Sequence, residues 1–413
     1  MKKLFFVWTC SIVLLCVGCG VEEKQKEEFS DEKEYTEEIT LMHVDGNKEE
    51  FQQFIKETEE KLQINIHVVT SPQNADNRHA KISTILSSGD DSVDVIAVND
   101  EMMSEFKSQG YLECLGQDVI SDEILSCYPE GYMEEIAMVD GEVYSVPYLM
   151  DIMLYWVNEQ YLSKAELYEI NTKEDFDKLL SFNYGNHNYG YGSAWEESYV
   201  YNELSQFVNM FGGDYQDWSN ENTREAVVYL HDMMEEGYVP KEQLVDQYEQ
   251  MEQKFISGQY GSIFMYSGSI DVFIRAGVYG EDKIHAAEVP LFKENITNVA
   301  TWQYVLNKAS QNKEAAKKFL AYAASREGSI AYSQAMHCLP ARLDIIEEED
   351  LNVPDMDVMR NYVKNVELKA RPFTSYPMED IKNIGKLFQR YAADEINLDE
   401  FCRQIQIIID ETD

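Results

Sequence analysis

Positive charge is scarce in this 413-residue sequence. Lys and Arg together number 34 against 76 Asp and Glu, which gives a formal net charge of −42 at pH 7. A protein with this charge repels nucleic acid and anionic lipid headgroups, so neither is expected as a partner. Its partners should be neutral or cationic, although the acidity has a simpler explanation in keeping the protein soluble.

Cysteine is also sparse and follows no metal-binding pattern. Three cysteines lie near the amino terminus and four are scattered through the rest of the chain: Cys10, Cys16, Cys19, Cys114, Cys127, Cys338 and Cys402. The last four form no C-x-x-C pair and no histidine cluster accompanies them, so we expect no metal site and no cofactor. The sequence is compatible with one or two disulfides and also with buried free thiols, because sequence alone does not fix which cysteines pair.

Familiar catalytic phrases are missing. The chain contains neither G-x-S-x-G nor H-E-x-x-H, which are typical of serine hydrolases and zinc proteases. A glycoside hydrolase, however, needs only two suitably spaced carboxylates, and acids abound here. Composition therefore leaves a secreted glycan-active hydrolase open as an alternative.

The amino terminus has the layout of a secretory signal peptide. Lys2 and Lys3 precede an uncharged apolar run from Leu4 to Val17, which is shorter than the about 20 residues of a transmembrane helix. Gly18 and Cys19 then resemble the end of a bacterial lipobox, although Cys16 stands where that motif usually has Leu. We expect Cys19 to be lipidated, with ordinary secretion or an uncleaved anchor as the alternatives.

Residues 20–38 are nearly all charged or polar. Such a segment cannot bury enough apolar surface to offset its loss of chain entropy, so it should not fold by itself. Like charges also extend it. We interpret these residues as a disordered acidic tether between the membrane and a folded body.

The roughly 390 residues after the leader are too many for one hydrophobic core, and they predict two lobes. Residues 40–98 alternate between short apolar runs and helical spacing, which predicts strand, helix, strand, helix, strand and a parallel sheet. Ligands bind beyond the carboxyl ends of such strands. This edge would carry His43, Val44 and Asp45 after the first strand, and Asn99, Asp100 and Glu101 after the third.

Later segments predict further helices and one strand. Two helices are expected within 200–236, separated by the glycine- and asparagine-rich stretch FGGDYQDWSNEN, with Gly237 at the end of the second. SIFMY, between glycines, predicts a strand, and NKEAAKKFLAYAASREG predicts a single helix. Tyr155 and Trp156 alternate with aliphatic residues, so at least one should lie in the core.

Six phrases in one order resemble the extracellular solute-binding proteins of ABC importers, family 1, which includes the maltose-binding type. They are DVIAVNDEMMSEFKSQGYLECL, DGEVYSVPYLMDIMLYWVNEQYL, FVNMFGGDY, QKFISGQYGSIFMYSGS, EVPLF, and TWQYVLNKASQNKEAAKKFLAYAASREG with CLPAR. The resemblance covers nearly the whole chain after the tether.

The resemblance implies a two-lobe α/β fold of the type II periplasmic-binding-protein class, with a hinge of several crossing segments and no catalytic residues. Crossings would fall near Pro147, Pro290 and Pro340. The amino-terminal lobe would then comprise residues 39–147 and 288–338, and the carboxy-terminal lobe residues 148–287 and 339–413.

The resemblance also implies ligand contacts. Asp151 lies where relatives often have an acidic contact, and Trp302 lies where many have a stacking tryptophan, although the two glycines before it are replaced by Ala300 and Thr301. Trp302 in the core is the alternative. Asp100 and Glu101 are candidates from the strand topology, and for all three acids a solvated loop position is the alternative.

Three further groups complete the predicted site. Trp195, Glu196 and Tyr199 lie in a stretch that lines the cleft in relatives. Ser267, Gly268 and Ser269 match a Gly-Ser-Trp phrase whose Trp is replaced here by Ile270, so one stacking surface is lost. Arg342 and Arg371 would either reach the cleft or pair with nearby acids.

The function implied is an ABC-importer lipoprotein that captures a carbohydrate and passes it unchanged to a permease. It would be a monomer on the extracytoplasmic face of a Gram-positive membrane, held there by its lipid alone. A glycan sensor or adhesin without a permease is a further alternative, and the sequence identifies no particular sugar.

Overall fold

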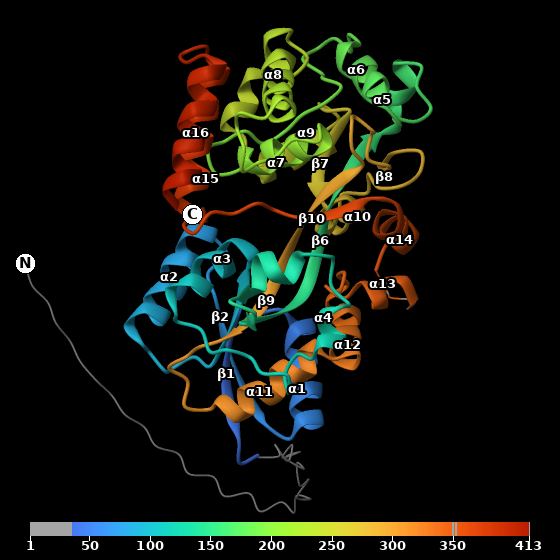
Figure 1. Cartoon of the computed structure of the whole chain (residues 1–413). Coiled ribbons are helices and arrows are strands. Elements are labelled where there is room, and N and C mark those ends of the chain that lie inside the picture. The colour runs from blue at the N-terminus through green and yellow to red at the C-terminus, as the bar shows by residue number, and fades with distance from the viewer. Residues whose placement is uncertain (1–34, 349–350, 352, 413) are drawn as a thin grey trace, which may run out of the picture. The chain divides into compact units, whose positions relative to one another are not determined.

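The fold is known from a computed structural model that describes residues 35–348, 351 and 353–412. The predicted leader, the lipidation site Cys19 and residues 20–34 of the predicted tether lie outside the described residues. From Tyr35 onward the chain is built on an eight-stranded sheet in the order β2-β1-β3-β9-β6-β7, with β10 beside β9 and β8 beside β6 (Figure 1). The strands are β1 Glu38–His43, β2 Asn65–Thr70, β3 Val95–Asn99, β6 Ser145–Asn158, β7 Ser262–Tyr266, β8 Ile284–Ala287, β9 Ile296–Leu306 and β10 Glu367–Ala370.

The amino-terminal lobe begins with the alternation that the sequence predicts. β1 is parallel to β2 and β3, and helices α1 (Glu49–Leu62) and α2 (Ala75–Ser88) connect the three strands. Phe51, Phe54 and Ile55 of α1 are buried, which is why a helix with this spacing packs on the sheet. The lobe also contains α3 Asp100–Gln109, α4 Asp122–Leu125, η1 Met133–Ala137, the hairpin of β4 Met138–Val139 and β5 Glu142–Val143, α11 Lys313–Ala324 and α12 Arg326–Met336.

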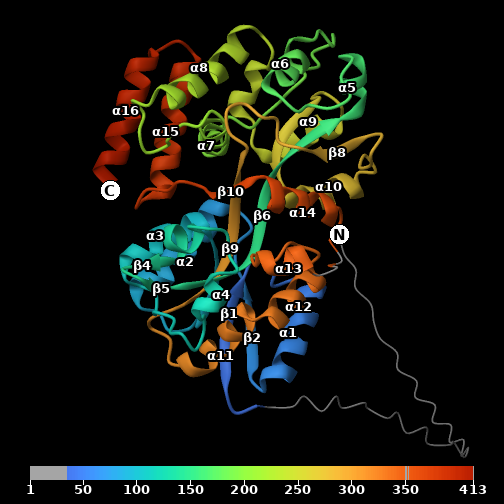
Figure 2. The same ribbon diagram turned by 45° about the vertical axis from the view of Figure 1, so that its right-hand side comes forward.

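Two long strands belong to both lobes. The first part of β6, up to Ile152, pairs antiparallel with β9, whereas its second part pairs with β7 on one side and β8 on the other. β9 also pairs with β3, so it joins the amino-terminal strands to β6. Tyr155 and Trp156 of β6 are both fully buried, as predicted for at least one of them. The fold therefore has two α/β lobes that share β6 and β9 (Figure 2).

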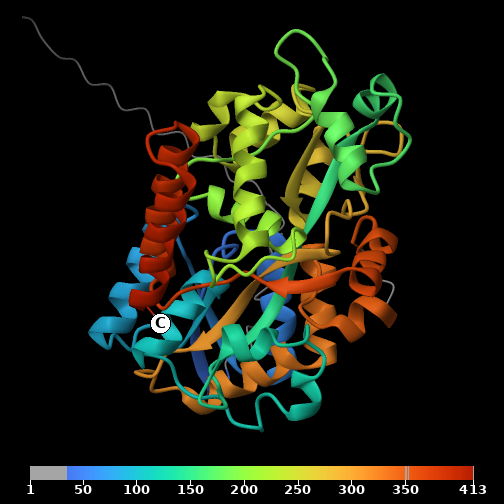
Figure 3. The same ribbon diagram turned by 45° about the horizontal axis from the view of Figure 1, so that its top comes forward.

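Most of the remaining helices belong to the second lobe, but α13 Leu343–Glu348 lies beside α12, which it contacts through the ion pair of Asp344 with Arg326 (Figure 2). The others are α5 Glu159–Lys164, α6 Lys173–Ser181, α7 Val200–Met210, α8 Glu221–Glu235, η2 Lys241–Val245, α9 Tyr248–Ile256, η3 Ser267–Ser269, α10 Ile270–Arg275, α14 Met356–Asn365, α15 Pro377–Ala392 and α16 Leu398–Thr412. α15 and α16 run side by side along α7 and α8 (Figure 3). The chain thus returns to this lobe after completing the other one.

Side-chain caps and a left-handed glycine mark the ends of several helices. Between α7 and α8, Asn220 caps the second helix by accepting hydrogen bonds from the backbone N–H groups of Asn222 and Thr223. Gly237 has φ 72° just after α8, the left-handed conformation expected there. The prediction of a single helix over 312–328 is wrong. The first helix ends at Ala324, and the Ser325 hydroxyl caps a second helix by accepting a hydrogen bond from Gly328 N–H at 3.1 Å.

The four cysteines within the described residues are free thiols: Cys114, Cys127, Cys338 and Cys402. Buried free thiols were one of the two alternatives left by the sequence; all four are free, but only Cys402 is buried and the other three are partly exposed. In the part of the chain that the structure describes, no helix is long and apolar enough to cross a membrane.

Glu203 is an ionisable group within the core of the carboxy-terminal lobe. It is 4% exposed and accepts a hydrogen bond from the hydroxyl of Tyr191. Burial raises its pKa from 4.5 to about 7. A carboxyl group with a raised folded-state pKa favours the folded state below its unfolded pKa, and this contribution is lost as pH rises toward the folded pKa.

We therefore expect Glu203→Gln to gain stability relative to the parent as pH rises from about 5 to 7.5, by roughly 2–3 kcal/mol. Urea unfolding at the two pH values measures the difference. Glu236→Gln, which changes an exposed carboxylate, serves as the control and should show little change. A Glu203→Gln difference that is independent of pH would contradict the assignment.

Candidate functional site

A cavity of about 200 Å³ lies where the middle of β6 meets segments of both lobes. The amino-terminal lobe contributes Asp45 and Lys48 from the turn after β1. The carboxy-terminal lobe contributes Ser267 and Gly268 of η3. Other lining residues are Leu149 and Asp151 of β6, Ile270, Asp271 and Arg275 of α10, Tyr332 and Met336 of α12, and His337, Cys338, Leu339, Val353 and Met359.

Asp151 lines this cavity and is held by η3. Its Oδ1 accepts hydrogen bonds from the Ser267 hydroxyl at 3.1 Å and from Gly268 N–H at 3.0 Å. The same Ser267 hydroxyl accepts from Ile152 N–H at 3.2 Å, which ties η3 to β6. A Cβ at position 268 would lie 3.2 Å from Asp151 Oδ1, so glycine permits this close approach. Burial raises the pKa of Asp151.

The turn after β1 is positioned by a buried histidine. His43 Nδ1 accepts a hydrogen bond from Asp45 N–H at 3.0 Å, and its Nε2 lies 3.0 Å from the hydroxyl of Tyr148. Because Nδ1 is an acceptor, we assign the proton to Nε2. Burial lowers the His43 pKa to about 3, which keeps the ring neutral. Asp45 then pairs with Lys48 at 2.9 Å on the rim of the cavity.

Arg371 joins the lobes on the connection between β10 and α15, which passes between α3 and α7 (Figures 1 and 2). Its guanidinium forms ion pairs with Asp100 and Glu101, the latter at 2.8 Å, both at the start of α3. It also donates to Asn202 of α7 at 3.0 Å. Arg371 is 5% exposed and Asp100 is fully buried, so we interpret them as a structural ion pair rather than as ligand contacts.

Electrostatics favour an ionised Arg371. Burial disfavours the charged guanidinium and lowers the pKa of Arg371, but Asp100, Tyr266 and Glu101 outweigh this effect and raise the pKa well above its usual value. Burial raises the pKa of the Asp100 carboxyl, and Arg371 opposes that shift. Of the two alternatives for Arg371, pairing with acids is therefore the one observed.

Trp302 lies on β9, between Asn99 of β3 and Leu149 of β6. Its ring is partly exposed, with the guanidinium carbon of Arg78 5.0 Å from the ring centroid. The Arg78 Nη1 is anchored by the carbonyl oxygen of Gln73 at 2.8 Å. Sequence reasoning missed Arg78, because α2 gives no sign that its first turn approaches a strand more than 200 residues later. Trp302 is available to a ligand only where Arg78 does not cover it.

Trp195 corrects one prediction, since its side chain is fully buried and packs edge-on against Phe388 of α15 at 5.1 Å. α15 approaches this loop so closely that a Cβ at Gly385 would lie 1.9 Å from the carbonyl oxygen of Glu197. These segments lie about 190 residues apart in the sequence, so the loop around Trp195 gives no sign that α15 covers it. We do not retain Trp195 in the candidate site.

Neighbouring predicted residues are oriented by their own loop. The Glu196 carboxylate accepts from Ser198 N–H at 2.9 Å. Tyr199 is partly exposed, and its ring meets Tyr248 edge-on at 4.9 Å. Neither residue lines the Asp151 cavity.

Two further candidates are engaged elsewhere. Arg342 pairs with Asp344 at 2.8 Å and donates to the carbonyl oxygen of Ala324 at 3.0 Å. Ser269 is buried and donates to Glu252, so its hydroxyl faces α9 instead of the cavity. The structure thus brings together Asp151, Ser267 and Gly268 from the predicted set, and adds Asp45, Lys48 and Asp271. Only Asp45 had been placed at this edge, from strand topology.

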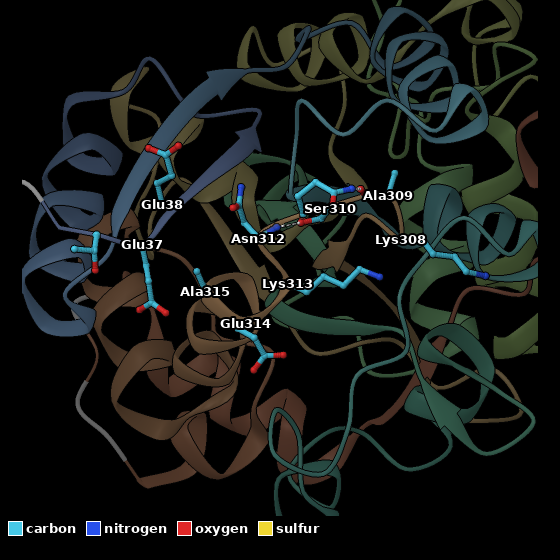
Figure 4. A pocket seen from close by; sticks show the side chains of 11 residues that line it. Glu37, Glu38, Lys308, Ala309, Ser310, Asn312, Lys313, Glu314 and Ala315 are labelled. Atoms are coloured by element: carbon cyan, nitrogen blue, oxygen red, sulfur yellow. Dashed lines mark hydrogen bonds between the residues drawn. The ribbon is translucent and has the colours of Figure 1, made fainter.

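A larger hollow, of about 860 Å³, lies elsewhere, at the start of β1 and the turn before α11 (Figure 4). Its polar groups already have structural partners, since Ser310 donates to Asp94 and the carboxylate of Asp94 lies 3.3 Å from the Asn312 amide. It contains none of the predicted site residues. This hollow is an open surface groove rather than an enclosed site.

One group within the described residues has metal-ligand chemistry. His231 and Glu235 of α8 and Asp394 after α15 bring one ligand atom each within 4.8 Å of the others. The His231 Nε2 already lies 3.2 Å from Asp394 Oδ1, and Asp394 is largely exposed. The contact is satisfied without an ion, so we assign no metal to it.

Comparison with known proteins supports the same fold. The profile described as "Bacterial extracellular solute-binding protein" matches residues 45–330. No curated protein sequence matches the chain.

Solved structures match over most of the chain. Maltose-bound MalE3 of T. maritima has a TM-score of 0.73 at 16% identity, covering 90% of this chain and 99% of that one. A solute-binding protein from Thermotoga lettingae with bound α-D-tagatose has 0.75 at 18%, covering 91% and 100%. UgpB of Mycobacterium tuberculosis with glycerophosphocholine has 0.73 at 15%, covering 91% and 98%. At these identities the likeness shows the two-lobe fold.

Arg371→Met should destabilise the protein by about 3–5 kcal/mol, because it leaves the Asp100 carboxylate buried without its partner. Chemical unfolding measures the loss. Arg403→Met, which removes an exposed pairing with Glu400, is the control and should cost less than about 1 kcal/mol. Adding Asp100→Asn to Arg371→Met should restore part of the stability, and equal losses in both arginine variants would refute the role of Arg371.

Proposed function

The chain belongs to the bacterial extracellular solute-binding protein family, and we propose that it captures a carbohydrate between its lobes and delivers it unchanged to an ABC importer. The observation that carries this proposal is the cavity on β6, where Asp151 is oriented by η3 and faced by Asp45. Carboxylate oxygens in such positions accept hydrogen bonds from sugar hydroxyls. The family binds solutes and does not transform them.

Apolar walls complete the chemistry of this cavity. Tyr332, Leu339 and Met336 border it and offer surface to the C–H face of a sugar ring. Trp302, Glu196 and Tyr199 lie outside it, and we keep them as contacts for a longer ligand. Maltose and tagatose in two similar structures support a sugar, while glycerophosphocholine in a third shows that this fold also binds other solutes.

We propose lobe closure as the signal to the permease. β6 and β9 run through both lobes, and the connection carrying Arg371 crosses between them, so a bend in these few segments would move one lobe against the other. A ligand drives closure only as far as the closed state binds it more tightly. The solute therefore has to touch both walls of the cavity, as its position between Asp45 and η3 allows.

We further propose that residues 1–19 direct export and that Cys19 carries the lipid anchor. Residues 20–34 would be the tether; the predicted tether reached residue 38, but Tyr35 N–H donates to Asn65 and Glu38 opens β1, so residues 35–38 belong to the folded body. The amino-terminal lobe would comprise residues 39–147 and 288–338, and the carboxy-terminal lobe residues 148–287 and 339–413. The protein would act as a monomer on the extracytoplasmic face of the cell membrane, beside its permease.

A thermal-shift panel of mono- and oligosaccharides tests the proposal. At least one sugar should raise the melting midpoint, since a ligand at 100 times its Kd stabilises the folded form by about 2.7 kcal/mol. Chromatography of the recovered sugar should find it intact. Cleaved sugar would support the hydrolase alternative, and the absence of any shift would contradict sugar binding.

Trp302→Ala should weaken binding of the sugar identified in that panel by about 2–13-fold if the ring stacks on it, as expected for loss of about 0.5–1.5 kcal/mol. Isothermal titration calorimetry provides the affinities. Tyr168→Ala removes an aromatic ring that is 96% exposed and should leave affinity unchanged. Unchanged affinity with a lower melting midpoint in Trp302→Ala would show that Trp302 packs in the core and does not contact the sugar.

A further inference from the structure

Asp151 is a partly buried carboxylate that lacks a cationic partner. Only neutral groups bind it, namely the Ser267 hydroxyl and Gly268 N–H, and both donate to Oδ1. Among the described residues no Lys, Arg or His forms an ion pair with it. Enclosed charges in proteins are normally paired, because their loss of hydration is costly. The carboxylate retains some exposed surface and lines the cavity, so the missing partner would have to come from there.

The other charges around the cavity do not supply that partner. Lys48 is paired with Asp45 at 2.9 Å. Arg275 is exposed, and its Nε donates to the carbonyl oxygen of Asp271 at 3.2 Å. Three carboxylates thus line the cavity with Lys48, Arg275 and the titratable His337, and none of these three basic residues forms an ion pair with Asp151. The wall is therefore negative where the solute would bind.

Arg371 does not neutralise Asp151 either. Its guanidinium is engaged by Asp100 and Glu101, and it acts on Asp151 only through space. The apolar side chains of Ile270, Leu339 and Met359 border the cavity. Apolar walls reduce dielectric screening, so a cation placed next to Asp151 would be attracted more strongly than in water.

We propose that the solute carries a positively charged amine that pairs with the Oδ2 atom of Asp151, which makes an amino sugar the expected substrate class. This inference rests on the proposed sugar-binding function. A hydroxyl can also donate to the carboxylate, but it leaves the charge uncompensated, whereas an ammonium both donates and compensates. The net charge of −42 would also draw a cation toward the protein.

The size of the cavity restricts the solute further. Its volume of about 200 Å³ is below the roughly 300–1,000 Å³ of pockets that hold drug-sized ligands. It therefore fits a single ring around the amine, and a second ring would extend toward Trp302. This defines the probes needed for a test.

The test compares sugars that differ only at one position. D-glucosamine carries an amine where D-glucose has a hydroxyl, and N-acetylglucosamine carries the same nitrogen without charge. Their β-1,4-linked dimers repeat the comparison with two rings. Affinities for the full mature chain, by calorimetry at pH 6, should favour the amine over both uncharged forms by at least about 10-fold, as expected of a charge-assisted bond.

Asp151→Asn should reduce this preference to less than about 2-fold, because the amide keeps the size of the side chain but not its charge. Asp357→Asn changes a fully exposed carboxylate on α14 and should preserve the preference. The parent protein alone already decides the question, so a variant that fails to fold does not prevent the test.

The outcomes separate the two proposals. Uncharged sugars that bind as tightly as the amines would overturn the amino-sugar inference and leave sugar binding intact. A preference for amines that survives in Asp151→Asn would also overturn it, since Asp151 would not be the partner. Failure of every sugar, charged or not, to bind would instead refute the proposed function.

Discussion

The two lobes depend on one buried guanidinium. Arg371 lies on a late crossing segment, pairs with Asp100 and Glu101 at the start of α3, and donates to Asn202 on α7. A fully buried carboxylate is tolerated only with such a partner, so this contact limits which arrangements of the lobes are stable. Four of the five N–H donors of Arg371 are already bound to Asp100, Glu101 and Asn202, so we expect a solute to rely mainly on the other residues of the cleft.

Strand β6 determines where the cavity lies. Its first part belongs to the amino-terminal sheet and its second part pairs with β7 and β8, so Asp151 lies where the lobes meet. η3 follows β7 directly and turns Ser267 and Gly268 back onto that carboxylate. The shared strand therefore does two tasks, since it links the lobes and presents an acidic group to anything held between them.

Much of the fold could be predicted from local pattern. The alternation of strands and helices over 40–98, the strand between glycines at 262–266, and the break between α7 and α8 all follow from periodicity and turn residues. The family resemblance correctly indicated two lobes. One helix boundary was missed at Ser325, where a capping side chain interrupts an otherwise continuous helical pattern.

The site could be predicted only in part, because its geometry comes from contacts distant in sequence. Strand topology correctly placed Asp45 on the rim, and the resemblance pointed to Asp151 with Ser267 and Gly268, which the fold joins across 116 residues. Trp195 was misjudged because α15, which covers it, comes about 190 residues later. Lys48 was missed because nothing in the turn before α1 marks it as the partner of Asp45.

Closure of the lobes on a solute is the central claim, and a distance across the cleft tests it most directly. Spin labels on cysteines introduced at Gln53 of α1 and Ile274 of α10, in a variant that lacks the native cysteines, report the distance between the two labels by double electron–electron resonance. Saturation with the best-binding sugar should shorten and narrow the distance distribution. An unchanged distribution in the presence of bound sugar would contradict closure.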